Sequence, residues 1–143
     1  MQEIVKYHNC FVCGDENPHG LQARFYVDGD RAVSEIKADD MFEGYRGIYH
    51  GGVISAMLDE VMIKALLAKG LFAVTAEMTV KFKRPLHTGA VVRFAGWATA
   101  HKGRVYFTEG EAVDENGEPY ATATGKYIEA RGDLREELTQ SLD

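Results

Sequence analysis

Two hydrophobic periods divide the chain between one long helix and several strands. Residues 53–70, VISAMLDEVMIKALLAKG, are apolar almost all the way round a helical turn and are rich in Ala, Leu and Met, which favour helix. Gly70 is placed to end this helix. In residues 72–84, FAVTAEMTVKFKR, apolar even positions alternate with polar odd positions from Thr75 onward. This period of two predicts a long strand with one buried face.

Five other segments have the pattern of strands bounded by turns: residues 21–27, 31–38, 90–100, 104–114 and 118–130. Two of the connections carry tight-turn sequences, Asp28-Gly29-Asp30 and Asn116-Gly117. Residues 39–52 hold four glycines and little periodicity, which indicates a loop. The tail predicts a short helix with Asp133 as its N-cap and a stripe of leucines.

The order of these elements predicts an α+β fold in which an antiparallel sheet wraps around one long central helix. A helix that is apolar nearly all round has to be buried nearly all round. The long strand edges of such a sheet need partners, which favours a homodimer built by edge pairing. The length of 143 residues is typical of one domain. We expect a single domain over 1–143, with an N-terminal segment (1–20), a core (21–130) and a C-terminal helix (131–143).

Composition and charge narrow the class of protein. Hydrophobic residues make up 45% of the chain and charged residues 27%, as in ordinary globular domains. No stretch is long and apolar enough to span a bilayer, and the N-terminus lacks the pattern of a signal peptide. Two cysteines without an export signal indicate reduced thiols. We therefore expect a cytoplasmic protein outside the membrane, and the net charge of −6 argues against a nucleic-acid binder.

The charges are unevenly spread along the chain. Residues 78–108 contain no acidic residue but six cations: Lys81, Lys83, Arg84, Arg93, Lys102 and Arg104. Such a segment in an acidic chain is suited to a compact anionic ligand, for example a phosphorylated cofactor. The alternative is that these cations lie on the solvated outer faces of strands.

One acidic residue interrupts the apolar surface of the predicted helix. Asp59 occupies its own face of the helix, apart from Glu60 and Lys64, which we interpret as a surface ion pair. Burying an unpaired carboxylate costs several kcal/mol, so Asp59 needs partners or a chemical task.

A glycine turn precedes the helix. His50-Gly51-Gly52 allows close backbone approach, and the first turn of a helix offers unpaired N–H groups at the positive end of its dipole. This geometry can hold a carbonyl oxygen that becomes an oxyanion. Asp59 lies about two helical turns beyond His50. The two groups could therefore meet at one centre only if a dimer set two such helices side by side.

Three stretches of the sequence resemble hotdog-fold acyl-CoA thioesterases, in the branch related to the phenylacetic-acid-pathway thioesterases. They are CFVCGDENPHGL (residues 10–21), GYRGIYHGGVISAMLDEVM (44–62) and AEMTVKFKRPLHTG (76–89). The resemblance extends to about Ile128. It implies a hotdog fold, a homodimer often paired into a homotetramer, active sites at the dimer interface, an acyl-CoA substrate, and no metal or cofactor.

Carried onto this sequence, the resemblance implies roles for individual residues. Asp59 would be the general base or the nucleophile that attacks the thioester carbonyl, and the Gly51 N–H would polarise the carbonyl oxygen. His50 would shape the turn and hydrogen-bond near the thioester, and Thr75 matches a hydroxyl position used in some members. Six residues before His50, where several members have a catalytic Asn, this chain has Gly44.

Six further residues are expected to contact the substrate. We expect Gly52, Tyr45 and Met62 beside the acyl group, where a bulky Met62 would narrow the pocket. The phosphates of coenzyme A are expected at cations near the late turns: Arg84, Lys102 and Arg104.

Cys10-x-x-Cys13 admits a second interpretation. His8 and His19 lie nearby and could complete four ligands for zinc. The spacing is not a standard one, however, and the resemblance implies chemistry without a metal. We therefore predict no metal site.

Two other functions compete with thioester hydrolysis. One is a dehydratase acting on hydroxyacyl thioesters, whose usual His and acid partner fit these residues less well. The other is a non-catalytic acyl-CoA binding or regulatory module, which would bind ligand without turnover.

Overall fold

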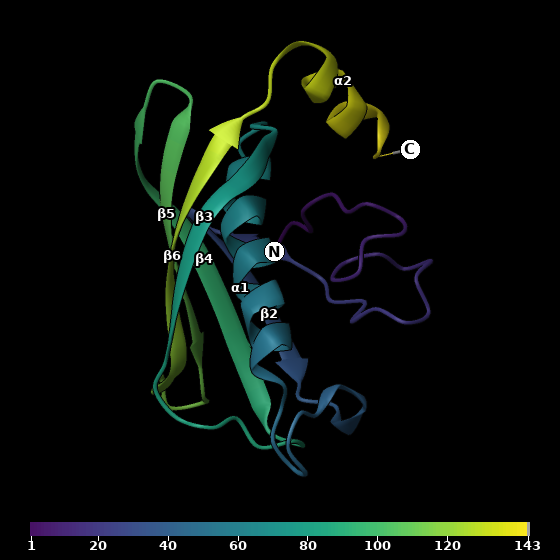
Figure 1. The fold of residues 1–143 in the computed structure, drawn as a ribbon, viewed down its shortest axis with the longest axis vertical. Coiled ribbons are helices and arrows are strands. Elements are labelled where there is room, and N and C mark those ends of the chain that lie inside the picture. Colours follow the sequence, from purple (N-terminus) through teal and green to yellow (C-terminus); the bar gives the residue numbers. More distant parts are fainter. Residues whose placement is uncertain (143) are drawn as a thin grey trace.

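The computed structural model describes residues 1–142, in which one antiparallel sheet carries a long helix (Figure 1). The strands are β1 (Tyr26–Asp28), β2 (Arg31–Lys37), β3 (Ala73–Phe82), β4 (Val91–Lys102), β5 (Val105–Val113) and β6 (Pro119–Glu129). Their order across the sheet is β1-β2-β4-β5-β6-β3. The helices are α1 (Gly51–Leu67), α2 (Gly132–Gln140) and a 3-10 turn, η1 (Asp40–Phe42). The predicted α+β fold, with an antiparallel sheet around one central helix and a short C-terminal helix, is confirmed.

Helix α1 packs closely against the sheet because the strands beneath it carry glycines. A Cβ atom at Gly96 in β4 would come 2.6 Å from the carbonyl oxygen of Val61, so the helix backbone lies directly on the strand. A Cβ atom at Gly110 in β5 would come 3.1 Å from the Met62 side chain. Met62 is fully buried as a result.

Strand β3 contains an irregularity that the alternating sequence conceals. Thr75 pairs with Tyr127 of β6, whereas Glu77 pairs with Lys126, so Ala76 is an extra residue in β3. A bulge of this kind shifts the faces of the strand by one residue. The expectation that all even positions share one face is therefore wrong. Thr75 lies on the helix face together with Met78, although its position is odd.

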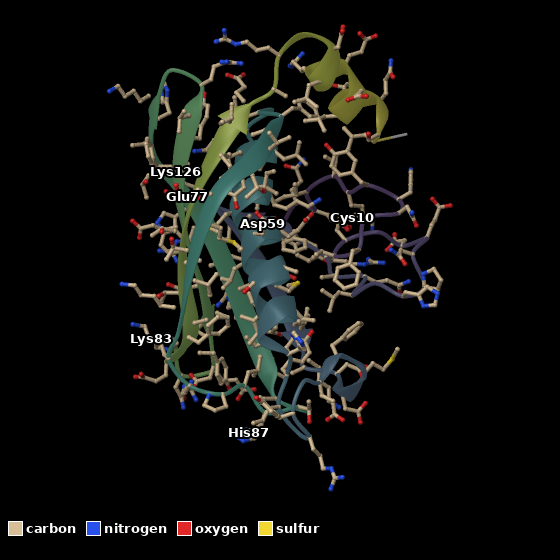
Figure 2. The ribbon with its side chains drawn as sticks, viewed as in Figure 1. Cys10, Asp59, Glu77, Lys83, His87 and Lys126 are labelled. Atoms are coloured by element: carbon tan, nitrogen blue, oxygen red, sulfur yellow. The ribbon has the colours of Figure 1, made fainter. Side chains whose placement is uncertain are left out.

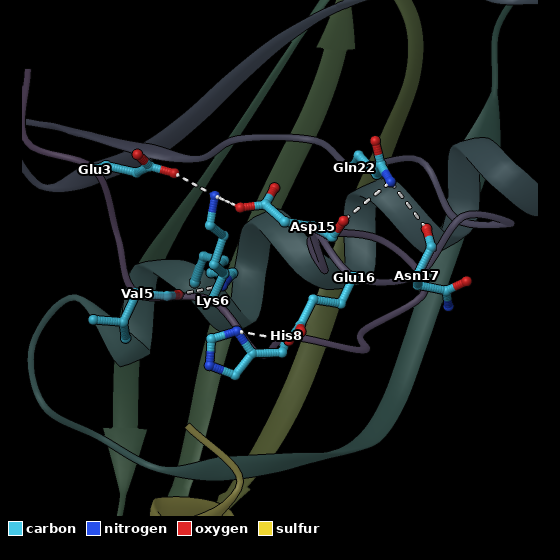
Figure 3. A network of polar contacts seen from close by, with 9 residues as sticks. Glu3, Val5, Lys6, His8, Asp15, Glu16, Asn17 and Gln22 are labelled. Carbon is cyan, nitrogen blue, oxygen red and sulfur yellow. Dashed lines mark hydrogen bonds and ion pairs between the residues drawn. The ribbon is translucent and has the colours of Figure 1, made fainter. Parts of the chain in front are cut away.

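The N-terminal residues 1–25 form loops on the side of α1 that faces away from the sheet (Figure 1). Lys6 bridges the carboxylates of Glu3 and Asp15 at 3.2 and 2.6 Å, and the Gln22 amide donates to the carbonyl oxygen of Asp15 (Figure 3). These contacts hold the loops together and leave their apolar residues to pack on the helix.

The N-terminal loops also change the environment of two charged residues of α1. Lys64 is fully buried, and its ammonium donates to the carbonyl oxygen of Val5 and lies 3.7 Å from Glu60. The expectation of a surface pair between Glu60 and Lys64 is therefore wrong. Burial raises the pKa of the Glu60 carboxyl to about 7. The helix is covered on this side because the N-terminal segment returns to it.

The two edges of the sheet differ. β1 is three residues long, whereas β3 is ten residues long and most of its side chains are at least partly exposed. Helix α2 begins at Gly132 with Arg131 as its N-cap, so the prediction of Asp133 as N-cap is wrong by two residues. Asp143, the end of the predicted C-terminal helix, lies outside the described residues. In residues 1–142, no helix has the length and apolarity needed to cross a membrane.

Candidate active site

The first candidate feature is the turn at the N-terminus of α1. His50 is the N-cap in an extended conformation, and its Nδ1 accepts a hydrogen bond from the Gly52 N–H at 2.8 Å. Within residues 1–142, the Gly51 N–H donates no hydrogen bond. This N–H lies at the positive end of the helix dipole, because Gly51 is the first residue of α1. It is available to an oxygen atom of a ligand.

A groove of about 1000 Å³ opens beside this turn. It is lined by three segments, residues 43–45, residues 48–52 with Ile54, and residues 82–86. Predicted site residues Tyr45, His50, Gly51, Gly52 and Arg84 all line it. The structure thus brings five of the ten predicted residues to one groove. Tyr45 is 83% exposed at its rim.

Asp59 is the second candidate feature, and it lies half-buried on α1 beside β3 (Figure 2). Its Oδ1 accepts hydrogen bonds from the Thr75 hydroxyl at 2.9 Å and from the Tyr127 hydroxyl at 2.8 Å. In the part of the chain that the structure describes, no donor contacts Oδ2. The carboxylate is therefore held by one oxygen and can offer the other to a water molecule or a substrate.

Tyr127 is a contact that sequence reasoning did not identify. It lies on β6 opposite Thr75, and its side chain is fully buried. Burial and the neighbouring Asp59 carboxylate raise the pKa of Tyr127, so its hydroxyl remains a donor. Only the pairing of β3 with β6 places it beside Asp59, and no motif in the sequence marks that pairing.

The two features are separate within one protomer. Asp59 follows Gly51 by eight helical positions, which at 1.5 Å per residue is about 12 Å. Asp59 is not among the residues that line the groove beside Gly51. One protomer alone therefore does not bring the carboxylate to the turn.

Three predicted substrate contacts lie elsewhere, and a fourth is already occupied. Met62 is enclosed between α1 and the sheet. Lys102 and Arg104 lie at the β4–β5 hairpin, at the end of the sheet opposite the groove. Arg84 lines the groove, but its guanidinium donates to Asp114 Oδ2 at 2.7 Å and lies 4.0 Å from the centre of the Tyr120 ring.

Lys83 is the groove cation that sequence reasoning named in the basic segment but did not place in the site. It lines the groove immediately after β3, and its side chain is exposed (Figure 2). Its position in the sequence, directly before the Arg84-Pro85 turn, could have indicated that it belongs to the site.

Comparison with a family model and with one curated relative points to one class of protein. Residues 46–121, just over half of the chain, match the model described as "Thioesterase superfamily". The chain is 28% identical over 131 residues to acyl-coenzyme A thioesterase THEM4 of Bos taurus. The match covers 89% of this chain but 54% of that protein, so the chain spans about half of its length.

Solved structures show the same fold. A thioesterase superfamily protein has a TM-score of 0.80 at 21% identity, over 85% of this chain and 61% of that one. Protein smu.793 of Streptococcus mutans UA159, bound to acetyl CoA, has a TM-score of 0.69 at 16% identity (74% and 86%). A mutant of the phenylacetic acid degradation protein PaaI of Thermus thermophilus has a TM-score of 0.67 at 25% identity (73% and 90%). The expected hotdog arrangement of sheet and helix is confirmed.

Proposed function

The chain belongs to the thioesterase superfamily, and we propose that it hydrolyses the thioester of an acyl-coenzyme A to a carboxylic acid and coenzyme A. The observation that carries the proposal is the Asp59 carboxylate, held by Tyr127 and Thr75 through one oxygen while the other is free. The same helix begins with an unpaired N–H at Gly51, as an oxyanion-binding group requires. The likeness to an acyl-CoA thioesterase supports this chemistry.

We place the active site between two protomers that pair through β3. β3 runs antiparallel to α1, because the Thr75 hydroxyl binds Asp59 while the Phe82 ring lies beside Gly51, 3.5 Å from where a Cβ atom would stand. Antiparallel pairing of two β3 edges, centred between Met78 and Thr79, would bring Thr75 close to Phe82 of the partner subunit. Asp59 of one protomer would then face the Gly51 turn of the other.

This arrangement supports a hydrolysis with a simple balance of bonds and protons. Asp59 Oδ2 removes a proton from water, and the water oxygen attacks the thioester carbon. The Gly51 N–H donates to the carbonyl oxygen as it becomes negative. The C–S bond then breaks, and the coenzyme A sulfur receives the proton from Asp59.

The alternative is that Asp59 acts as the nucleophile. Its carboxylate would attack the thioester carbon and release coenzyme A, and water would then hydrolyse the mixed anhydride. Single turnover in ¹⁸O-labelled water tests this route: when water attacks the carboxyl carbon of Asp59 in the anhydride, the label enters Asp59, which the general-base route never labels.

The phosphates of coenzyme A fit the cationic rim of the groove. Lys83 is exposed there, whereas the charge of Arg84 beside it is paired with Asp114. Lys102 and Arg104 would approach this groove only from the partner subunit, since pairing of the β3 edges reverses the ends of the second sheet. We retain a tetramer of two such dimers and the phenylacetic-acid branch as narrower proposals, the latter supported by the likeness to PaaI.

Gly44 stands where several members of the family have a catalytic Asn. This difference supports one competing function, a module that binds acyl-CoA without hydrolysing it. Gly44 supplies no side chain to position water, and its N–H donates to the Ile48 carbonyl oxygen. Thiol release from a panel of acyl-CoAs, from acetyl through aromatic to long-chain, tests the proposal. We expect turnover that falls about a hundredfold in Asp59→Asn. Acyl-CoA binding without turnover in the wild type would favour the module instead.

A further inference from the structure

A cluster of metal-ligating atoms lies outside the proposed active site, between the N-terminal loops and α1. The sulfurs of Cys10 and Cys13 and a carboxylate oxygen of Glu60 lie within 4.8 Å of one another. Cys10 and Glu60 are 50 positions apart in the sequence. We propose that Cys10, Cys13 and Glu60 bind one zinc ion, which ties the N-terminal segment to the helix that carries Asp59.

The turn that holds the two cysteines has the geometry of a thiolate site. The Cys13 backbone N–H donates to the Cys10 sulfur at 3.3 Å, and such bonds stabilise a thiolate. Gly14 completes the turn at a position without space for a side chain, because a Cβ atom would come 2.4 Å from the His8 carbonyl oxygen. The CFVCG sequence therefore fixes both sulfurs on the side that faces α1.

The distances suit a tetrahedral metal ion. Zinc binds thiolate sulfur at about 2.3 Å and carboxylate oxygen at about 2.0–2.2 Å, which sets neighbouring ligand atoms about 3.5–4 Å apart. The Cys10 sulfur lies 3.9 Å from each carboxylate oxygen of Glu60. Cys10 and Glu60 also line a cavity of about 290 Å³, from which a water molecule could supply a fourth ligand.

Charge favours a divalent cation in the cluster. Two thiolates and the Glu60 carboxylate carry three negative charges in a largely buried site, and Lys64 supplies one positive charge from 3.7 Å. A zinc ion would bring the sum to zero, and it would offset the burial that makes the Glu60 carboxylate costly. Thiolate ligands favour zinc over magnesium or calcium.

The two histidines considered as ligands from the sequence do not reach the cysteines. His8 is exposed, and its Nδ1 lies 3.2 Å from the Glu16 carboxylate (Figure 3). His19 is exposed as well. The third ligand comes instead from α1, which the sequence could not indicate because the helix returns to the loop only in the folded chain.

Metal analysis of the full-length protein, purified without chelator and after reconstitution with zinc, tests the proposal. We expect one zinc per chain, and a thiolate-to-cobalt charge-transfer band when cobalt(II) replaces it. Cys13→Ser and Glu60→Gln should each weaken the affinity about tenfold or more. The matched controls His8→Ala and His19→Ala should bind as the wild type does.

Three outcomes would overturn this assignment. They are the absence of zinc and of the cobalt band in the reconstituted wild type, unchanged affinity in both ligand variants, and loss of binding in either histidine variant. If Cys13→Ser does not fold, Glu60→Gln and the thermal transition of the wild type with and without chelator decide the question. We expect the chelator to lower the Tm, because the ion binds only the folded chain.

Discussion

The hydroxyl of Tyr127 donates to Oδ1 of Asp59 at 2.8 Å and lies 3.2 Å from the carbonyl oxygen of the same residue. The two residues are 68 positions apart in the sequence. Tyr127, which lies on the sheet, thereby holds the Asp59 side chain in place against helix α1. The free Oδ2 therefore keeps one orientation, as a general base or a nucleophile requires.

Removal of the Tyr127 hydroxyl tests whether this contact positions the carboxylate. Tyr127→Phe should lower kcat for acyl-CoA hydrolysis about tenfold or more with little change in KM, because Asp59 loses orientation but no substrate contact is removed. Stability should fall by only about 1–2 kcal/mol. Tyr106→Phe, on the neighbouring strand β5, is the control and should leave kcat unchanged. A kcat equal to that of the wild type in Tyr127→Phe would remove the positioning role.

Thr75 can be separated from the packing of its strand. Thr75→Val keeps the shape but removes the donor to Asp59, and we expect kcat to fall about three- to tenfold. Thr75→Ser keeps the hydroxyl and should retain most of the activity. Thr79→Val changes the same group on the opposite face of β3 and should have no effect. The measurement is the steady-state kcat of the three variants. An equal fall in kcat in all three would mean that the packing of β3, and not the Thr75 hydroxyl, supports activity.

The Gly51 N–H can be removed with little change to the helix. His50 has φ −65° and ψ 128°, a conformation that a following proline accepts, and proline is well tolerated at the first helical position. Gly51→Pro should therefore lower kcat about a hundredfold, as expected for loss of an oxyanion donor. Gly51→Ala keeps the N–H, and its Cβ would lie at an ordinary 3.5 Å from Phe82. Equal losses of activity in both variants would point to crowding of the turn instead.

Lys83 is expected to contribute to binding and not to the chemical step. Lys83→Glu should raise the KM for acyl-CoA about tenfold at low salt, with kcat unchanged, and the difference should shrink as salt screens the charges. Lys81→Glu makes the same charge change two residues earlier in β3, where Lys81 lies near Trp97 and Glu109 and does not line the groove. A similar rise in KM in both variants would show a general effect of net charge.

The architecture, the glycine turn at Gly51 and the isolated carboxylate of Asp59 were predictable from the sequence for a physical reason. An apolar helix that starts with His-Gly-Gly and carries one isolated carboxylate leaves few arrangements, and the strand patterns were strong enough to define a sheet. The partners of Asp59 were harder to predict. Thr75 was misplaced because a bulge at Ala76 leaves no trace in the alternating letters, and Tyr127 depends on strand pairing.

The environment of Glu60 and Lys64 shows a second limit. Their spacing along the helix is typical of a surface ion pair, and the sequence does not reveal that residues 1–25 fold back over them. Arg84 was expected to be free for phosphates, yet Asp114 and Tyr120 contact it from the β5–β6 connection and β6. Both differences come from long-range packing, which local patterns do not contain.

Mixing of two inactive variants tests most directly whether the site is shared between protomers. Asp59→Asn and Gly51→Pro dimers, allowed to exchange subunits, would form mixed dimers in which one of the two sites has both native groups. If half of the dimers are mixed, thiol release should recover to about one quarter of the wild-type rate. Confirmed subunit exchange without any recovery of activity would contradict an active site in which Asp59 of one protomer faces the Gly51 turn of the other.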